Sequence, residues 1–164
     1  SATLTPAAQF EVDFTIDFRD AAIGHQSKQM AVVNGAFVDE LMDSRTFVSD
    51  SDVNALLKSG LALGGSLDNA VVVDGDRVLN PEGFRHADEC VRHKMLDAVG
   101  DLALAGAPIM GRYKGVRAGH GVTNRLLHKL FSTPGAFRLE PCTLADVAGL
   151  PGIARQDEAL RRIA

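Results

Sequence analysis

The sequence has little of three features that would each point to a special class of protein. Its 164 residues include two cysteines, Cys90 and Cys142, too few for the disulfide framework of a small secreted domain, so a reducing compartment is favoured. It has no basic run, and its 17 Lys and Arg are outnumbered by 21 Asp and Glu, which argues against binding a nucleic-acid backbone. Apolar runs such as residues 70–73 are far shorter than the roughly 20 residues that span a bilayer.

These absences leave an ordinary globular protein as the expectation. Residues 1–9 have no charged segment followed by an apolar one, so they do not read as a signal peptide. We therefore expect a soluble, cytoplasmic protein without a membrane span. The hydrophobic fraction of 46% and the charged fraction of 23% suit one domain with its own core. The chain does not begin with methionine, which suggests processing or excision from a longer protein.

The hydrophobic pattern predicts both strands and helices. Residues 10–18 alternate apolar and polar side chains without a break, which is typical of a half-buried strand. A helical period follows later, over residues 84–105, with Pro81 before it and Gly106 after it. The other expected strands are residues 29–34, 45–48, 70–73, 77–79 and one or two within 109–118. The other expected helices are residues 36–42, a short one capped by Ser51 or Asp52, and residues 122–131.

This order of elements predicts the fold class. Hairpins and strands followed by helices, without regular strand-helix-strand alternation, favour an α+β fold with helices packed on one face of a mainly antiparallel or mixed sheet. A doubly wound parallel sheet is less favoured. We expect residues 1–9 to be a linker, residues 10–135 to form the domain and residues 136–164 to form a C-terminal tail.

The stretch RHKMLDAVGD at residues 92–101 carries the first candidate site. His93, Asp97 and Asp101 are spaced four residues apart, so on a helix they lie along one stripe, and neighbours on that stripe have Cβ atoms about 6 Å apart. A histidine nitrogen and a carboxylate oxygen both suit zinc. The commoner meaning of the spacing is a hydrogen bond within the helix. We do not expect Cys90 as a further ligand, because successive helical turns span too much axial rise; it reads as a buried apolar side chain.

A second candidate is His120, which lies between Gly119 and Gly121 just before a predicted helix. A histidine in such a loop is a candidate general acid, while a structural or merely exposed role is equally compatible with the pattern. Asp101 would then accept a hydrogen bond from the ring of His120, fix its tautomer and favour its protonated form.

Several runs of residues resemble one known family. They are GGSLDNA at residues 64–70, RVLN at 77–80, DECVRHKMLDAVGD at 88–101 and the pair Gly119 and His120, joined by FTIDF at 14–18 and RTF at 45–47. This ordered set resembles the second half of LpxC, the zinc-dependent UDP-3-O-acyl-N-acetylglucosamine deacetylases of lipid A synthesis. The resemblance extends from about residue 10 to about residue 130, and HKMLD is specific to the family.

The resemblance implies roles for individual residues. His93 and Asp97 match two of the three ligands of the family's Zn²⁺ ion, His120 matches its catalytic histidine, and Asp101 matches the carboxylate that orients it. Thr46 matches a threonine that helps to hold the tetrahedral intermediate. The implied substrate-binding residues are Phe14 near the uracil, Phe47 in the cleft, and Asp52, Lys94 and Arg117 at the nucleotide-sugar, with Arg117 at a position where the family has lysine. Residues 46–72 resemble a strand-helix-strand insert whose apolar wall forms a passage for the acyl chain.

One departure from the family pattern limits what this chain can do. The family's third zinc ligand and its general-base glutamate come from a His-Glu pair in an N-terminal half, and this sequence contains no His-Glu dipeptide. The resemblance therefore implies half of a deacetylase, inactive alone and dependent on the N-terminal half for turnover of UDP-3-O-acyl-N-acetylglucosamine. The alternatives are a non-catalytic module that binds a nucleotide-sugar, an acyl group or a protein, and a plain α+β domain with a buried polar network.

Overall fold

A four-stranded sheet forms the base of the molecule. The computed structural model describes residues 1–60, 63–143, 146 and 150–151. Strand β2 (Phe10–Asp17) alternates buried and partly exposed residues, as its sequence predicts, and its apolar side chains face the core. It pairs in parallel with β7 (Gly111–Val116) and antiparallel with β3 (His25–Ala31). Strand β1 (Ala2–Pro6) completes the order β1-β7-β2-β3. The sheet is therefore mixed.

Strand β1 corrects the prediction that residues 1–9 are a linker. Residues Ala2–Pro6 pair antiparallel with β7, from Ala2 opposite Gly115 to Pro6 opposite Gly111. Ala2 and Leu4 pack against the core. The prediction was wrong because this strand is short and contains threonine and proline, so its hydrophobic pattern is weak. Its pairing depends on the free edge of β7, which lies more than 100 residues later in the chain.

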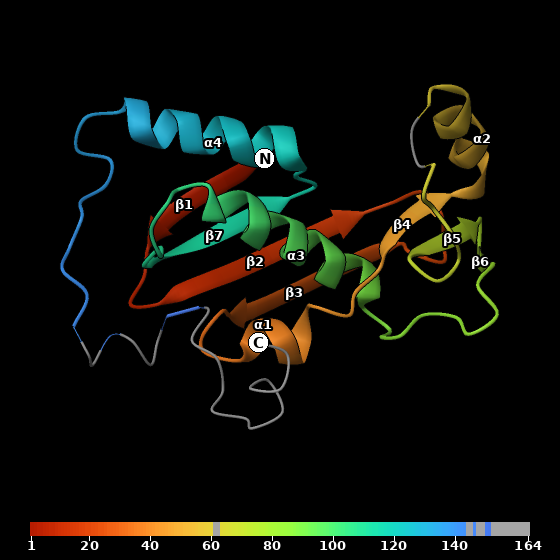
Figure 1. Cartoon of the computed structure of the whole chain (residues 1–164), viewed down its shortest axis with the longest axis horizontal. Helices are drawn as coiled ribbons and strands as arrows, with labels where there is room; N and C mark the ends of the chain where they lie inside the picture. The colour runs from red at the N-terminus through yellow and green to blue at the C-terminus, as the bar shows by residue number, and fades with distance from the viewer. Residues whose placement is uncertain (61–62, 144–145, 147–149, 152–164) are drawn as a thin grey trace.

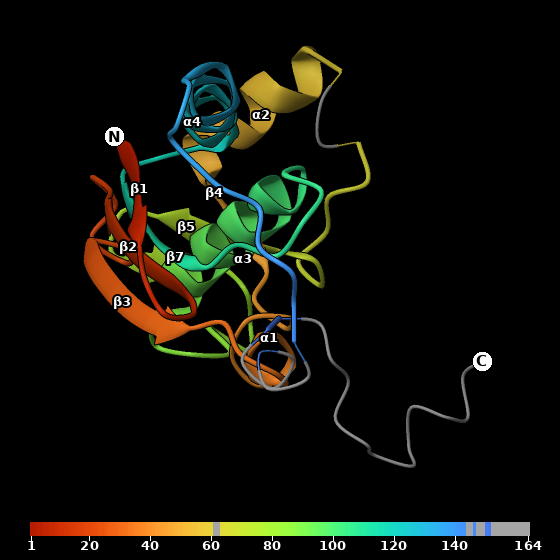
Figure 2. The same ribbon diagram turned by 90° about the vertical axis from the view of Figure 1, so that its left-hand side faces the viewer.

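Two helices cover one face of this sheet (Figures 1 and 2). Helix α3 (Glu89–Ala103) packs on β2 and β3, and α4 (His120–Ser132) packs on α3 and β1. Cys90, Val91, Met95 and Leu102 of α3 are buried, which matches the stripe expected of an amphipathic helix. The predicted α+β fold, with helices on one face of a mixed sheet, is confirmed.

The ends of these two helices differ from the prediction. Helix α3 begins at Glu89, five residues after the predicted start, because Gly83 has a positive φ of 70° and the chain before Glu89 forms turns. Helix α4 begins at His120, two residues before the predicted start, and Gly119 precedes it in an extended conformation. His120 is thus the first residue of a helix rather than a loop residue.

A smaller unit at one end of the main sheet contains the predicted insert (Figure 1). Strand β4 (Thr46–Ser49), helix α2 (Asp50–Lys58) and strand β5 (Ala70–Asp74) follow one another, and β4 pairs in parallel with β5. Strand β6 (Arg77–Val78) adds an antiparallel hairpin partner to β5. The strand-helix-strand insert is confirmed, although α2 follows Ser49 rather than a cap at Ser51 or Asp52. Residues 61 and 62 lie outside the described part.

The remaining described segments surround this framework. Helix α1 (Ala36–Glu40) is a short helix between β3 and β4. No helix among the described residues combines the length and apolar character that crossing a bilayer requires. Of the predicted tail 136–164, the structure describes residues 136–143, 146, 150 and 151.

Candidate active site

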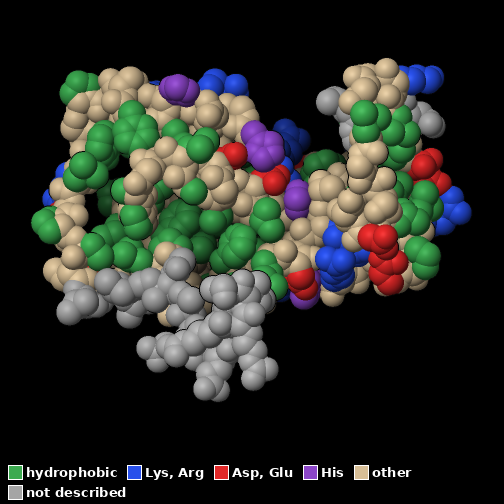
Figure 3. All heavy atoms as spheres, in the orientation of Figure 1, with side chains coloured by type: hydrophobic (Ala, Val, Ile, Leu, Met, Phe, Trp, Pro, Cys, Tyr) green, Lys and Arg blue, Asp and Glu red, His purple; other side chains and the backbone are tan. Residues whose placement is uncertain are grey.

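The candidate site lies where α3, the start of α4 and the insert meet. The Nε2 atom of His93 is 3.4 Å from Oδ1 of Asp97, and Nε2 of His120 is 3.8 Å from Oδ2 of Asp97. Figure 3 shows the molecule from the same side as Figure 1, and histidine and acidic side chains gather near the middle of the face in view. They lie beside the recess that separates the helical layer from the insert. The i, i+4 spacing on α3 and the turn before α4 therefore bring together residues 27 positions apart in the chain.

The backbone sets the orientation of His93. Its Nδ1 atom is 3.1 Å from the carbonyl oxygen of Ser44. A carbonyl only accepts hydrogen bonds, so Nδ1 carries a proton, and Nε2 is the ring nitrogen that faces Asp97. A ring nitrogen fixed in this way by a backbone carbonyl is the usual arrangement of metal-ligating histidines.

His93 and Asp97 are therefore suited to hold a zinc ion by their donor atoms. Their side chains are each 16% exposed, so they are partly desolvated and still open on one side. Within the described residues, no group of three or more His, Cys, Asp and Glu side chains is arranged to hold a metal ion. The described part of the chain thus supplies two candidate ligands, whereas zinc sites in proteins take at least three.

His120 and Asp101 form the second pair of the site. Both carboxylate oxygens of Asp101 lie close to Nδ1 of His120, at 2.9 and 3.0 Å. Because a carboxylate ion only accepts hydrogen bonds, Nδ1 carries a proton and Nε2 is directed away from Asp101. The His120 side chain is 69% exposed, so a ligand can reach Nε2. The structure places the two residues in the contact that the sequence predicts.

The turn before His120 has an unusual backbone. Arg117 has a φ of 47°, which is uncommon for a residue other than glycine and costs of order 1 kcal/mol or more. Its N–H donates to the carbonyl of Thr15 at 2.8 Å, which holds the turn against the end of β2. Its side chain is 68% exposed and lies 3.9 Å from Asp17. Arg117 therefore remains available to an anionic ligand.

Lys94 lies in the site but is already engaged by a carboxylate. Its Nζ atom is 2.6 Å from Oδ2 of Asp97, and its side chain is 18% exposed. Thr46 is exposed at the first position of β4.

A cavity of about 450 Å³ lies between the insert and the end of the main sheet. Its lining residues include Phe18, Ile23, Phe47, Asp52 and Leu56. The Phe47 ring meets the rings of Phe18 and His93 edge to face, with centroids 5.1 and 6.1 Å away. Phe47 therefore connects the cavity to the candidate metal ligand. Asp52, a predicted substrate residue, lies at the same cavity.

Phe14 does not lie in this site. It is 1% exposed, and its ring packs on Tyr113 with centroids 6.2 Å apart. The alternation of β2 turns this side chain into the core, where its function is packing. Its buried ring therefore has no exposed face for the uracil contact that the family resemblance implies.

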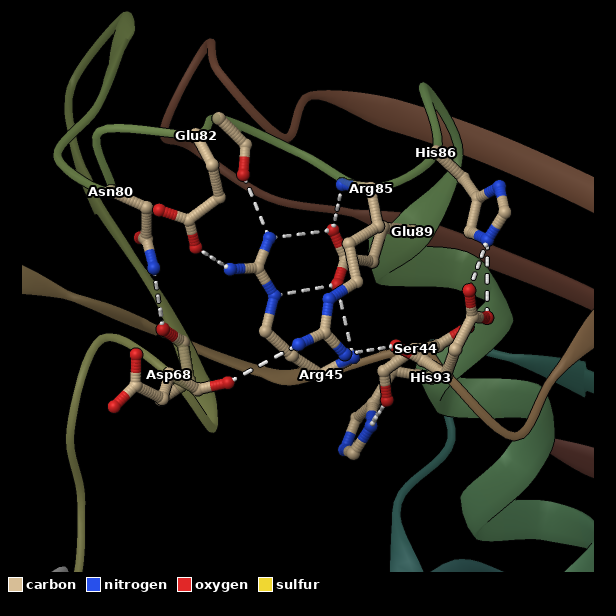
Figure 4. Close-up of polar contacts among 12 residues, drawn as sticks. Ser44, Arg45, Asp68, Asn80, Glu82, Arg85, His86, Glu89 and His93 are labelled. Carbon is tan, nitrogen blue, oxygen red and sulfur yellow. Dashed lines mark hydrogen bonds and ion pairs between the residues drawn. The ribbon is translucent and has the colours of Figure 1, made fainter.

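The sequence analysis assigned no role to Arg45 and Glu89, which form a buried ion pair beside the site (Figure 4). Arg45 Nε is 2.9 Å from Glu89 Oε1. Burial opposes the ionisation of Glu89, but hydrogen bonds from Arg45 and from the backbone N–H of Arg85 outweigh it and lower the pKa of Glu89. The one sequence signal for this pair was a glutamate one helical turn before His93. It was weak because Arg45, the partner of Glu89, is 44 residues away in the chain.

Comparison with known proteins identifies the family to which this set of residues belongs. The LpxC family, described as UDP-3-O-acyl N-acetylglycosamine deacetylase, matches residues 1–132. The chain belongs to the LpxC family. The match begins at the strand that we expected to be a linker and ends with α4 at Ser132.

Curated LpxC relatives extend well beyond this chain. The chain is 54% identical over 138 residues to the UDP-3-O-acyl-N-acetylglucosamine deacetylase of Phenylobacterium zucineum, which covers 84% of the chain and 47% of that relative. The protein of the same name from Anaeromyxobacter sp. is 46% identical, and the match covers 84% of the chain and 45% of that relative. The one from Pasteurella multocida is 45% identical, and the match covers 92% of the chain and 49% of that relative. The chain thus spans about half the length of the curated relatives it matches.

Proposed function

We propose that this chain is the part of a zinc-dependent deacetylase that supplies two metal ligands and the catalytic histidine. The substrate of the complete enzyme is UDP-3-O-acyl-N-acetylglucosamine, and the reaction belongs to lipid A biosynthesis in the cytoplasm. The observation that carries the proposal is the position of Asp97, which lies within 3.8 Å of both His93 and His120. A metal ligand pair and an Asp-supported histidine thus share one site.

The residues of this chain divide the chemistry between them. A zinc ion held by His93, Asp97 and a ligand from elsewhere would supply the Lewis acidity that polarises water and the acetamide carbonyl. His120, with its Nδ1 proton held by Asp101, donates from Nε2 to the developing oxyanion and then gives that proton to the leaving amine. The Thr46 hydroxyl is a second donor to the oxyanion.

Other residues of the site bind the rest of the substrate. Arg117 and Lys94 carry the positive charge that a diphosphate requires, and Asp52 offers a carboxylate to sugar hydroxyls. The cavity of about 450 Å³ beside Phe47 is lined largely by apolar side chains and suits the acyl chain.

The partner in this proposal is the remaining half of the enzyme. By family resemblance, that half brings the third zinc ligand and the general-base glutamate, both from a His-Glu pair. We expect the isolated chain to bind zinc weakly and to have negligible turnover, because two ligands hold a metal poorly and no base activates the water.

Complementation tests this proposal directly. The chain is mixed with Zn²⁺ and a separately produced N-terminal half of the Phenylobacterium zucineum relative, and acetate release from the UDP-sugar is measured. We expect turnover in the mixture and none with either half alone. His120→Ala is expected to lower kcat by at least about 100-fold, and Asp101→Asn by about 10-fold or more. His128→Ala, an exposed histidine on the same helix, is the matched control. Activity that survives His120→Ala within a few-fold would show that another group is the acid.

The apolar cavity beside Phe47 also supports a second candidate, a non-catalytic module that binds the acyl or nucleotide-sugar group. This function predicts binding of the UDP-sugar by the chain, measured by calorimetry, without acetate release in any mixture. Turnover in the complemented mixture would exclude it.

A further inference from the structure

The contacts around Arg45 and Glu89 are unusually complete for a pair that touches no ligand. Arg45 is 4% exposed and Glu89 is 0% exposed. One Glu89 oxygen accepts from the backbone N–H and Nε of Arg45 at 3.0 and 2.9 Å, and the other accepts from Nη2 at 3.1 Å and from the Arg85 N–H at 2.7 Å. Arg45 also donates to the Gly83 carbonyl at 2.7 Å and to Glu82 (Figure 4).

The position of this pair relates it to the candidate active site. Glu89 and His93 are one turn apart on α3, so they lie on the same face of the helix. Arg45 lies between Ser44, whose carbonyl accepts from His93 Nδ1 at 3.1 Å, and Thr46, which begins β4. Glu89 accepts from the backbone N–H of Arg45, and Arg45 is the residue between the Ser44 carbonyl and Thr46.

Stability alone explains this arrangement poorly. A buried ion pair is desolvated at a cost that often exceeds its attraction, and apolar residues of similar volume frequently replace such a pair without loss. A bidentate pair does fix geometry, however, because the planar guanidinium accepts few orientations. The Glu89 contact to the Arg45 backbone N–H adds a restraint on the main chain, and this main chain presents the Ser44 carbonyl to His93.

We propose that Arg45 and Glu89 are a positioning pair for the active site. They hold residues 44–46 against α3 so that the Ser44 carbonyl keeps the proton on Nδ1 of His93 and Thr46 is presented at the start of β4. The inference rests on the proposed function where it treats His93 as a zinc ligand. The tautomer of His93 is a property of this chain alone and is measurable whether or not the complemented enzyme is active.

The test measures the His93 ring in the complete 164-residue chain. Nitrogen chemical shifts of ¹⁵N-histidine-labelled protein report which ring nitrogen carries the proton, and calorimetry with Zn²⁺ alone reports metal affinity. In the unmodified chain we expect the neutral His93 ring to be protonated at Nδ1. Arg45→Lys and Glu89→Gln are expected to give a mixture of tautomers and to weaken zinc binding about tenfold.

Two arginine variants serve as matched controls. Arg92→Lys alters a second ion-pair cluster of α3, with Asp88 and Glu40, that does not involve residues 44–46. Arg77→Lys alters an exposed pair in the hairpin of β5 and β6. Both are expected to leave the His93 tautomer and zinc affinity unchanged. A His93 ring that keeps the Nδ1 proton and its zinc affinity in folded Arg45→Lys and Glu89→Gln would overturn the proposal.

A double variant covers the case in which the single variants fail to fold. Arg45→Met with Glu89→Leu removes both charges and retains apolar volume. We expect it to fold, as circular dichroism checks, with mixed tautomers at His93. A folded double variant with an unaltered His93 ring would reduce the pair to a structural role. Absence of acetate release in the complemented mixture would instead count against the proposed function and would leave the tautomer result standing.

Discussion

Cys90 and His93 show how residues three positions apart on α3 can have opposite surroundings. Cys90 is buried in the core, and burial raises the pKa of its thiol to about 12. His93 is partly exposed and faces Asp97. Cys90 packs within the hydrophobic core cluster, in agreement with its interpretation as a buried apolar residue.

Thiol labelling tests this difference. We expect Cys142, which is exposed, to react with Ellman's reagent at pH 8 at least on the order of a hundredfold faster than Cys90. The Cys142→Ser variant should therefore be nearly inert until it is unfolded. Because the folded pKa is raised, the neutral thiol contributes stability that is lost as pH rises from 9.0 toward 12. Two fast thiols in the native chain would contradict the buried position of Cys90.

At the scale of elements, the close approach of β2 and β7 depends on a glycine. Gly115 lies opposite Phe14 in the parallel register. A Cβ atom at Gly115 would lie 2.7 Å from the Phe14 ring and 2.9 Å from the Tyr113 ring, which is below contact distance. The two rings pack on each other, so neither has room to move away.

Two glycine substitutions should therefore act in opposite directions. Gly115→Ala is expected to lower the free energy of unfolding by about 1–3 kcal/mol through overpacking. Gly100→Ala, at an exposed position of α3 with no atom within 4 Å of the added Cβ, is expected to raise it by about 0.5–1 kcal/mol. Urea denaturation followed by circular dichroism measures both. A Gly115→Ala variant as stable as the unmodified chain would show that β2 and β7 separate easily.

At the scale of the whole molecule, the main sheet and the insert are connected by α3. This helix packs on β2 and β3, and its first residue, Glu89, holds Arg45 immediately before β4. The pair thus joins the two sheets. Removing one partner of such a pair leaves the other charge buried, at a cost of about 3–5 kcal/mol.

Acid should weaken this connection. The pKa of Glu89 is lowered in the folded chain, so its contribution to stability is fully present above its ordinary value of 4.5 and is lost as pH falls through the lower folded value. We expect Glu89→Gln to be less stable at neutral pH and to lose less further stability below pH 4.5. Urea denaturation between pH 3 and pH 7 measures this difference. Parallel curves for the two proteins would show that Glu89 is not the titrating group.

The local pattern of the sequence determined the elements and the local pairs of this protein. Alternation in residues 10–18 predicted β2, and the four-residue spacing of His93, Asp97 and Asp101 placed them on one side of α3, because helical and strand periods are short-range properties. The RHKMLD run also identified the LpxC family, which the comparison confirmed. The Asp101 contact with His120 was expected because a carboxylate can accept from the ring of a candidate general acid and fix its tautomer.

Tertiary structure decided what depends on distant neighbours. Residues Ala2–Pro6 became a strand because β7 offered an edge, and Phe14 turned into the core because of the face on which the helices pack. The Ser44 carbonyl on His93 and the Arg45 contact with Glu89 join residues 49 and 44 positions apart. No local period encodes such a contact, because it arises only when the β4 strand and α3 are packed together. The sequence by itself therefore indicated the candidate ligands, and packing alone determined how their side chains are held.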